Sequence, residues 1–245
     1  MGPIGRRVLG LGAVALGVPG LVFASLLAMG QPLEHAPPIA AYACAGLLIA
    51  AGVAINVPRV AAAAALVLTA YFALWTLGLH LPNALKQPMV WVSWESLAED
   101  TAMVLGGLLA YAQLQGATPR ADAIRSIVRP LFGVCLVVFG TSEFVYSKFT
   151  ASLVPAWLPP SQLAWTYLTG VAHIAAGLAV LSGVRARLAA ILLTAMYAVF
   201  GLIVHIPRVI AHPDAAGAWS EHGVNLVLLG AAWCLADALA PKRAA

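Results

Sequence analysis

The residues of this sequence that are most able to take part in chemistry are ionisable side chains inside long apolar runs. Glu143 and His173 lie within two such runs, and His80 and His205 lie at the ends of two others. A charged side chain at the centre of a bilayer costs about 2.5–3.5 kcal/mol, so it usually faces the interior of a helix bundle and has a partner there. A carboxylate beside an imidazole can relay a proton, bind a quinone or hold a metal ion.

Glu143 and His173 are predicted to form such a pair. Each lies several residues from the short loop between two antiparallel helices, so the two side chains are expected at similar depth. A buried pair that only fixes packing is the alternative, and His80 and His205 could likewise be helix-end residues that cap carbonyls before a proline. The candidate ligand-binding residues are Glu143, His173, His205, His222, Asn225, His80 and Asp100.

Other chemistries have weaker support. Zinc, copper or iron could use Glu143, His173, His205 and His222, but these lie one per helix with no closely spaced pair, so a quinone is favoured over a metal. Thiol exchange needs paired accessible thiols. No C-x-x-C pair, Ser-His-Asp spacing or phosphate-binding loop occurs, so the sequence leaves open whether the protein is an enzyme. Single cysteines that are expected to be packing residues are Cys44, Cys135 and Cys234.

The composition indicates the elements that must position these residues. The 245 residues are 62% hydrophobic and 9% charged, whereas soluble domains are roughly 45–50% apolar and about 25% charged. The sequence therefore predicts an all-α polytopic membrane protein, and it excludes nucleic-acid binding, a Rossmann or P-loop domain and a secreted disulfide scaffold. The expected spans are 8–28, 39–57, 60–80, 95–115, 130–147, 162–183, 186–206 and 220–240.

The distribution of cations predicts the orientation. Eight spans place both termini on one side, and ten of the 13 Lys and Arg residues fall there: Arg6, Arg7, Arg59, Arg120, Arg125, Arg129, Arg185, Arg187, Lys242 and Arg243. The positive-inside rule then puts both termini in the cytoplasm. Seven of the nine acids and all six histidines, His35 and His212 included, are expected on the outer side or in the outer half. Arg6-Arg7 before an apolar run is also typical of a twin-arginine signal, but we expect this segment to remain as the first span.

An internal duplication organises the chain. At a shift of 125 residues the two halves align without a gap from Tyr42 to Gly107, and the matches include His80/His205 and Trp94/Trp219. The first spans align at a shift of 123, which leaves Gly20 and Leu48 opposite Glu143 and His173. We therefore expect two parallel four-helix repeats, packed side by side, at 1–118 and 130–245, joined by a cytoplasmic linker at 119–129.

The second half resembles the DoxX-like membrane protein family. The resemblance covers about residues 130–206 and rests on Phe139-Gly-Thr-Ser-Glu-Phe-Val-Tyr146, Val154-Pro-Ala-Trp-Leu-Pro-Pro160, Thr169-Gly-Val-Ala-His-Ile-Ala-Ala-Gly-Leu-Ala-Val-Leu181 and Gly183-Val-Arg-Ala-Arg-Leu-Ala-Ala190. It implies a four-helix membrane unit, and some members of the family belong to redox systems. This chain departs from the family pattern by duplicating the unit and by having His173 where many relatives have an acid.

Two functions are compatible with these observations. The first is a redox-associated subunit of a bacterial inner membrane that binds a quinone or another lipophilic ligand in the outer half of the bilayer, with a membrane or periplasmic redox partner. The second is a non-catalytic membrane protein, which could be a binder, a permease-like protein or an assembly factor. The scarcity of polar residues in the inner halves of the spans weighs against a permease for charged solutes.

Overall fold

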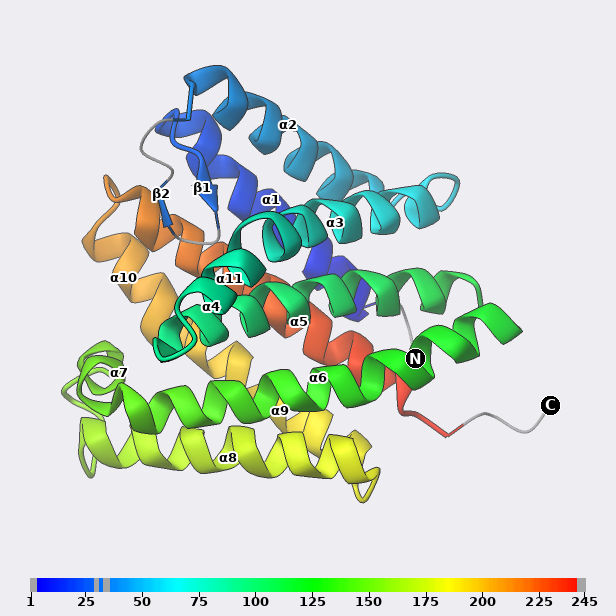
Figure 1. Cartoon of the computed structure of the whole chain (residues 1–245). Coiled ribbons are helices and arrows are strands. Elements are labelled where there is room, and N and C mark those ends of the chain that lie inside the picture. Colours follow the sequence, from blue (N-terminus) through cyan, green and yellow to red (C-terminus); the bar gives the residue numbers. More distant parts are fainter. Residues whose placement is uncertain (1–3, 29–30, 33–35, 242–245) are drawn as a thin grey trace.

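The protein is an all-helical bundle with one minimal β-hairpin (Figure 1). The computed structural model describes residues 4–28, 31–32 and 36–241, so His35, Lys242 and Arg243 lie outside the described residues. The elements are α1 (Ile4–Val22), β1 (Leu27–Ala28), β2 (Gln31–Pro32), α2 (Pro38–Ala54), α3 (Ala61–Trp75), η1 (Thr76–His80), α4 (Leu81–Lys86), α5 (Trp91–Leu114), α6 (Pro119–Val145), α7 (Ser147–Leu153), α8 (Gln162–Ser182), α9 (Ala186–Phe200), η2 (Gly201–His205), α10 (Ile206–Ala211) and α11 (Ala216–Ala238). The two strands are antiparallel, with Leu27 opposite Pro32.

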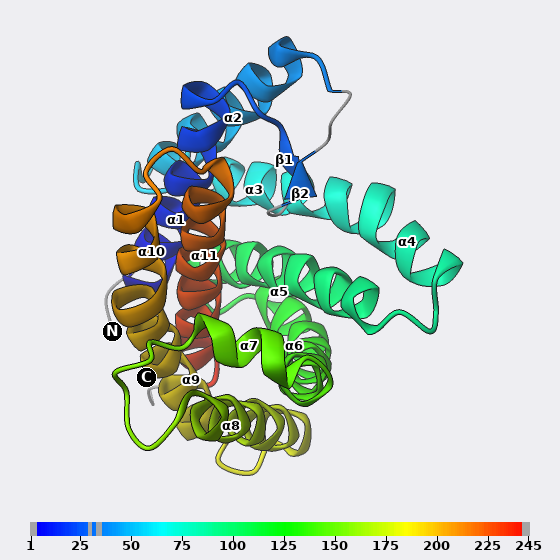
Figure 2. The same cartoon turned by 90° about the vertical axis from the view of Figure 1, so that its left-hand side faces the viewer.

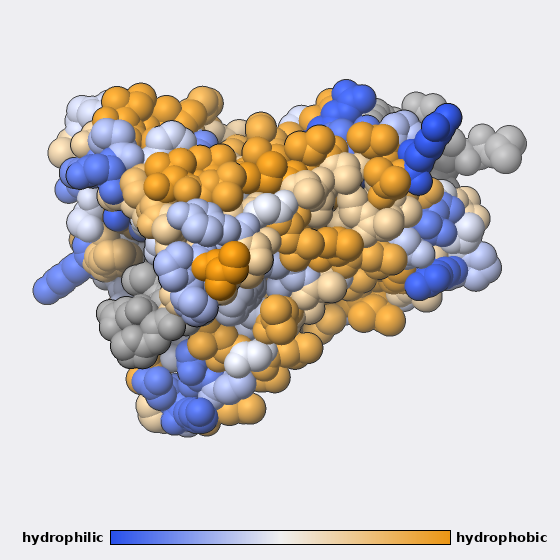
Figure 3. Space-filling model, turned by 90° about the horizontal axis from the view of Figure 1, so that it is seen from above, coloured by the Kyte–Doolittle hydropathy of each residue, from blue (hydrophilic) through white to orange (hydrophobic). Residues whose placement is uncertain are grey.

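The helices have the length and surface of a membrane protein. Among the described residues, five are long and apolar enough to cross a bilayer, namely Ile4–Val22, Ala61–Lys86, Pro119–Val145, Gln162–Ser182 and Ala186–Ala211. Pro38–Ala54 is a shorter apolar helix. Bulky aliphatic side chains such as Leu74, Leu178 and Leu192 point outward, and Figure 3 shows an apolar band between two hydrophilic ends. Such a band fits contact with lipid.

Two helices continue through the prolines at which breaks were expected. Pro82 and Pro207 each lie in the first turn of a short α-helix that follows a π-helical turn, where a missing N–H needs no partner. In the π turns, the Leu81 N–H donates to the Thr76 carbonyl and the Ile206 N–H donates to the Gly201 carbonyl. His80 and His205 are the last residues of these turns and directly precede α4 and α10, where neither side chain makes a capping hydrogen bond.

The segment expected to be a linker is helical. Residues 119–129 form the first turns of α6, because Thr118 accepts a hydrogen bond from the Ala121 N–H and Pro119 occupies the first position of the helix. The first helix also differs from expectation, since α1 begins at Ile4 and ends at Val22. These differences move helix ends only and leave the order of the apolar elements unchanged.

Helices of the first half recur in the second half at the shift read from the sequence. The bounds of α3, η1 and α4 plus 125 are those of α9, η2 and α10. The helix pairs α1–α2 and α6–α8 also approach at equivalent glycines. A Cβ at Gly10 would lie 2.6 Å from the Gly52 carbonyl, and one at Gly133 would lie 3.0 Å from the Gly177 carbonyl.

The two halves interlock, whereas we expected them to lie side by side. The first helix of each half packs against the last helix of the other, so α1 contacts α11 and α6 contacts α5. Helices α5 and α11 pack against each other at the centre (Figure 2). These helices can approach closely because small residues line their contacts. A Cβ at Gly230 would lie 2.3 Å from the Leu9 nitrogen, and one at Gly106 would lie 2.4 Å from the Ala231 Cβ.

One end of the bundle carries most of the described cations. The start of α1, the end of α11 and the connections α2–α3, α5–α6 and α8–α9 gather at the right of Figure 1. The arginines of these segments are Arg6, Arg7, Arg59, Arg120, Arg125, Arg129, Arg185 and Arg187. The opposite end contains α4, α7 and α10 and most of the acids and histidines.

Candidate functional site

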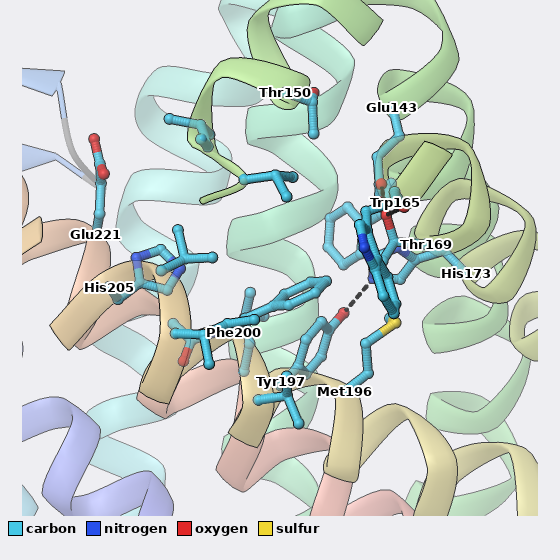
Figure 4. Close-up of a pocket in the computed structure, with 18 of the residues that line it drawn as sticks. Glu143, Thr150, Trp165, Thr169, His173, Met196, Tyr197, Phe200, His205 and Glu221 are labelled. Atoms are coloured by element: carbon cyan, nitrogen blue, oxygen red, sulfur yellow. Dashed lines mark hydrogen bonds and ion pairs between the residues drawn. The ribbon is translucent and has the colours of Figure 1, made fainter. Parts of the chain in front are cut away.

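A large cavity opens in the half of the bundle that contains α7 and α10. Its volume is about 1090 Å³, which is at the upper end of the range for small-molecule sites. Helices α5, α6, α8, α9 and α11 surround it, and α7 and the loop after it cover one side. The lining is mainly aliphatic and aromatic, with two groups of polar side chains on opposite walls (Figure 4).

The first group is a hydrogen-bonded cluster of Glu143, Thr169, His173 and Tyr197. The Glu143 Oε1 lies 2.6 Å from the His173 Nδ1, and the other carboxylate oxygen accepts a hydrogen bond from the Thr169 hydroxyl. The His173 Nε2 lies 3.2 Å from the Tyr197 hydroxyl oxygen. Glu143 is 9% exposed and His173 is 4% exposed. The predicted contact between Glu143 and His173 is therefore confirmed, whereas their role in ligand binding stays a prediction.

Local packing fixes the positions of these side chains. Thr169 and His173 are one turn apart on α8, so both face α6. The two helices approach closely because Gly140 has no side chain. A Cβ at this position would lie 2.5 Å from the Gly170 carbonyl oxygen. The imidazole packs against the rings of Phe139 and Phe200 as well as Tyr197. The cluster thus has little freedom to change shape.

The cluster belongs to the second half alone. The counterparts of Glu143 and His173 are Gly20 and Leu48, and the same shifts place Cys44 and Phe72 opposite Thr169 and Tyr197. Every polar member therefore has a less polar counterpart. Sequence reasoning found the first two members but missed Thr169 and Tyr197. The comparison between the halves could have identified both residues, because Thr169 and Tyr197 each have a hydroxyl where the counterpart is a cysteine or an apolar residue.

The second polar group lies on the opposite wall of the cavity and includes two of the predicted residues, His205 and Asn225. His205 from η2 and Asn225 from α11 line the wall, and the Arg208 Nη1 lies 3.1 Å from the Glu221 Oε2. The ring of His222 lies beside that of His205, with 6.4 Å between centroids, but His222 does not line the cavity. His205 and Glu221 face the cluster from the opposite side (Figure 4).

His80 and Asp100 form a separate buried pair outside this cavity. The His80 Nε2 lies 3.2 Å from the Asp100 Oδ2, in a geometry that forms no hydrogen bond, and the two residues are 2% and 0% exposed. His80 also lines a small cavity of about 190 Å³. The counterparts of this pair are His205 and Asn225. The structure thus divides the seven predicted residues between two locations.

Two carboxylates on α5 were not predicted as site residues. Glu95 and Glu99 line the large cavity, one helical turn apart. They lie at the start of the expected span 95–115, but nothing in the sequence indicates that α5 of the first half contributes to a cavity of the second half. That contribution follows from the contact between α5 and α6.

The described residues offer no clear metal site. Among them, no group of three or more His, Cys, Asp and Glu side chains could hold a metal ion. His205 and His222 are neighbours, whereas Glu143 and His173 contact each other on the opposite side of the cavity. The four proposed ligands therefore do not converge. The three cysteines are free, and Cys135 and Cys234 are buried packing residues as expected.

Tryptophans close the loops around this end of the bundle. The indole N–H groups of Trp94, Trp165 and Trp219 each donate to the carbonyl of a proline six residues earlier, at 3.1, 2.8 and 3.0 Å. Trp94 and Trp219 are counterparts, as are the prolines they bind. These residues therefore fix the turns that precede α5, α8 and α11.

The comparisons with known proteins gave one match, to a family model that covers part of the chain. Residues 132–236 match a family described as a domain of unknown function (DUF8561). The match begins within α6 and ends near the end of α11, so it contains the whole Glu143 cluster but not α5. Searches among curated proteins and among solved structures gave no match.

Proposed function

We propose that this protein binds a lipophilic molecule with a hydrogen-bonding head in the outer half of a bilayer, and that a quinone is the leading candidate. The observation that carries the proposal is the large apolar cavity with the Glu143–His173–Tyr197 cluster in its wall. Ligand pockets typically combine an apolar lining with a few fixed polar groups in this way. A cluster that served only to pack the helices together would not require a cavity beside it.

The cluster has the chemistry to recognise a hydroxyl or carbonyl head. With its Nδ1–H donating to Glu143, a neutral His173 accepts a hydrogen bond from the Tyr197 hydroxyl at its Nε2. The Tyr197 oxygen then keeps a lone pair for a ligand hydroxyl. The same chain of groups could pass a proton from that hydroxyl to the carboxylate, which is what a quinol site would need.

We place the protein in a bacterial inner membrane as eight spans in two repeats, with both termini in the cytoplasm. The cations at one end of the bundle support this orientation. The DoxX-like resemblance covers α6, α8 and α9, which are the helices that contribute the cluster, and it supports a role beside a membrane or periplasmic redox partner.

A permease for polar solutes has less support. Among the described residues, the buried polar side chains lie in the half of the bundle around the two cavities: Thr76, His80, Asp100, Ser142, Glu143, Thr166, His173, Ser220 and Asn225. The other half offers no comparable polar path. A non-catalytic binder would use the same cavity, so the ligand and its redox behaviour distinguish it from a redox subunit.

The proposal can be tested with protein purified from its native membrane. Bound lipids and quinones would be extracted and identified, and decylubiquinone would be titrated into protein in nanodiscs. We expect saturable binding that weakens at least about tenfold in Tyr197→Phe and Glu143→Gln, because each removes a hydrogen bond next to the head. Tyr111→Phe is the matched control, since Tyr111 is equally buried but lies far from the cavity. Equal binding by all variants, or none by the wild type, would refute the quinone assignment.

A further inference from the structure

The carboxylates of Glu95 and Glu99 have no positive partner. Both line the cavity, and none of the described ion pairs includes either one. The other two glutamates of the cavity differ, because Glu143 contacts His173 and Glu221 contacts Arg208. Among the described residues, the cavity therefore has two carboxyl groups on one wall that form no ion pair with a cationic side chain.

Glu95 and Glu99 are both half-buried, and both line the cavity. Glu95 lies close to Ser142 and Glu143, and Glu99 lies close to Glu95 and Glu221. An unpaired carboxylate in apolar surroundings is costly. A fold that aims two of them into one cavity has a strong preference for a positively charged occupant.

Aromatic rings complete a setting for such a charge. Tyr146, Trp165 and Phe200 line the same cavity as the two carboxylates, and ring faces attract organic cations, especially where water is excluded. The rest of the lining is aliphatic, which suits an apolar body attached to the charge. Arg208 also lines the cavity, but Glu221 offsets its charge.

We propose that the cavity selects lipophilic cations, in which an apolar body carries an amine, ammonium or similar positive centre held between Glu95 and Glu99. This inference rests on the proposed function, because it assumes that the cavity binds an amphiphile, and it names the class of ligand that binds best. The Glu143–His173–Tyr197 cluster then contacts the remainder of the ligand.

Two probes of the same shape and opposite charge test the proposal. Tetraphenylphosphonium and tetraphenylborate would be titrated into the full-length protein in nanodiscs, with empty nanodiscs to subtract partitioning and with decylubiquinone as a neutral probe. We expect tetraphenylphosphonium to bind at least about tenfold more tightly than tetraphenylborate. Glu99→Gln and Glu95→Gln should each reduce tetraphenylphosphonium binding by about tenfold. Asp237→Asn is the matched control, because it removes a carboxylate of α11 that does not line the cavity.

The outcomes separate this inference from the proposed function. Binding of decylubiquinone without preferential binding of the cation would overturn the inference and leave the proposed function standing. Binding of neither probe would overturn both. Cation binding that Glu95→Gln and Glu99→Gln do not weaken would overturn the assignment of the charge to α5. Circular dichroism and thermal unfolding of each variant would establish that it is folded.

Discussion

The coupling between Glu143 and His173 offers the sharpest test of the site. We consider His173→Leu, Glu143→Leu and the double variant. The first change leaves a carboxylate that is 9% exposed with Thr169 as its remaining partner. A buried carboxylate that loses its main partner costs about 3–5 kcal/mol, because its charge is then uncompensated. We expect about 3 kcal/mol for His173→Leu, since Thr169 offsets part of that cost.

The reverse change should cost less. In Glu143→Leu the imidazole keeps its contact with Tyr197, so a loss of about 1–2 kcal/mol is expected, as for one hydrogen bond. The double variant removes both desolvated groups. Replacing a buried pair by apolar residues of similar volume is often neutral or stabilising, and the first half already accommodates Gly20 and Leu48 at these positions. We therefore expect it to unfold within about 1 kcal/mol of the wild type.

These values correspond to a coupling free energy of at least about 3 kcal/mol, well above the few tenths found for independent sites. It can be measured by SDS-induced unfolding in mixed micelles, followed by tryptophan fluorescence, for the wild type, both single variants and the double variant. Glu143→Leu combined with Tyr111→Phe serves as a control pair that should be additive. If the effects of Glu143→Leu and His173→Leu are additive, the two side chains do not interact as described and the site loses its central contact.

Three further predictions follow from the packing and the topology. Gly140→Ala should lower the free energy of unfolding by about 1–3 kcal/mol, because its Cβ would lie 2.5 Å from the Gly170 carbonyl. In the control Gly46→Ala the new Cβ meets nothing within 4 Å, so this change should be neutral or stabilising by up to about 1 kcal/mol. Similar losses for both variants would contradict the described α6–α8 contact. Trp219→Phe should cost about 1 kcal/mol in the same assay by removing the hydrogen bond to the Pro213 carbonyl, and an unchanged stability would show that this bond contributes nothing. A green fluorescent protein fused to the C-terminus should fluoresce in a bacterial host and an alkaline phosphatase fusion should be inactive, and the opposite pattern would reverse the proposed orientation.

Much of the fold could be predicted from particular residues. The long apolar runs indicated the helices, because a 20-residue run of this kind has few other stable environments. The matches His80/His205 and Trp94/Trp219 indicated equivalent structures in the two halves, and the structure gives these helices matching bounds. Helix ends were harder to predict, because Pro82 and Pro207 can either stop a helix or occupy the first turn of the next one. The structure has the second arrangement.

By itself, the sequence determined that this chain forms apolar helices and that the pair Glu143 and His173 is peculiar to the second half, because hydropathy and the comparison of the two halves are properties of the chain alone. Only the tertiary structure decided what surrounds that pair. Side-chain contacts between distant segments depend on which helices become neighbours, and here close packing at small residues makes the two halves interlock. This packing brings Tyr197 to His173 and aims Glu95 and Glu99 of the first half into a cavity of the second, while it keeps His80 and Asp100 apart from that cavity.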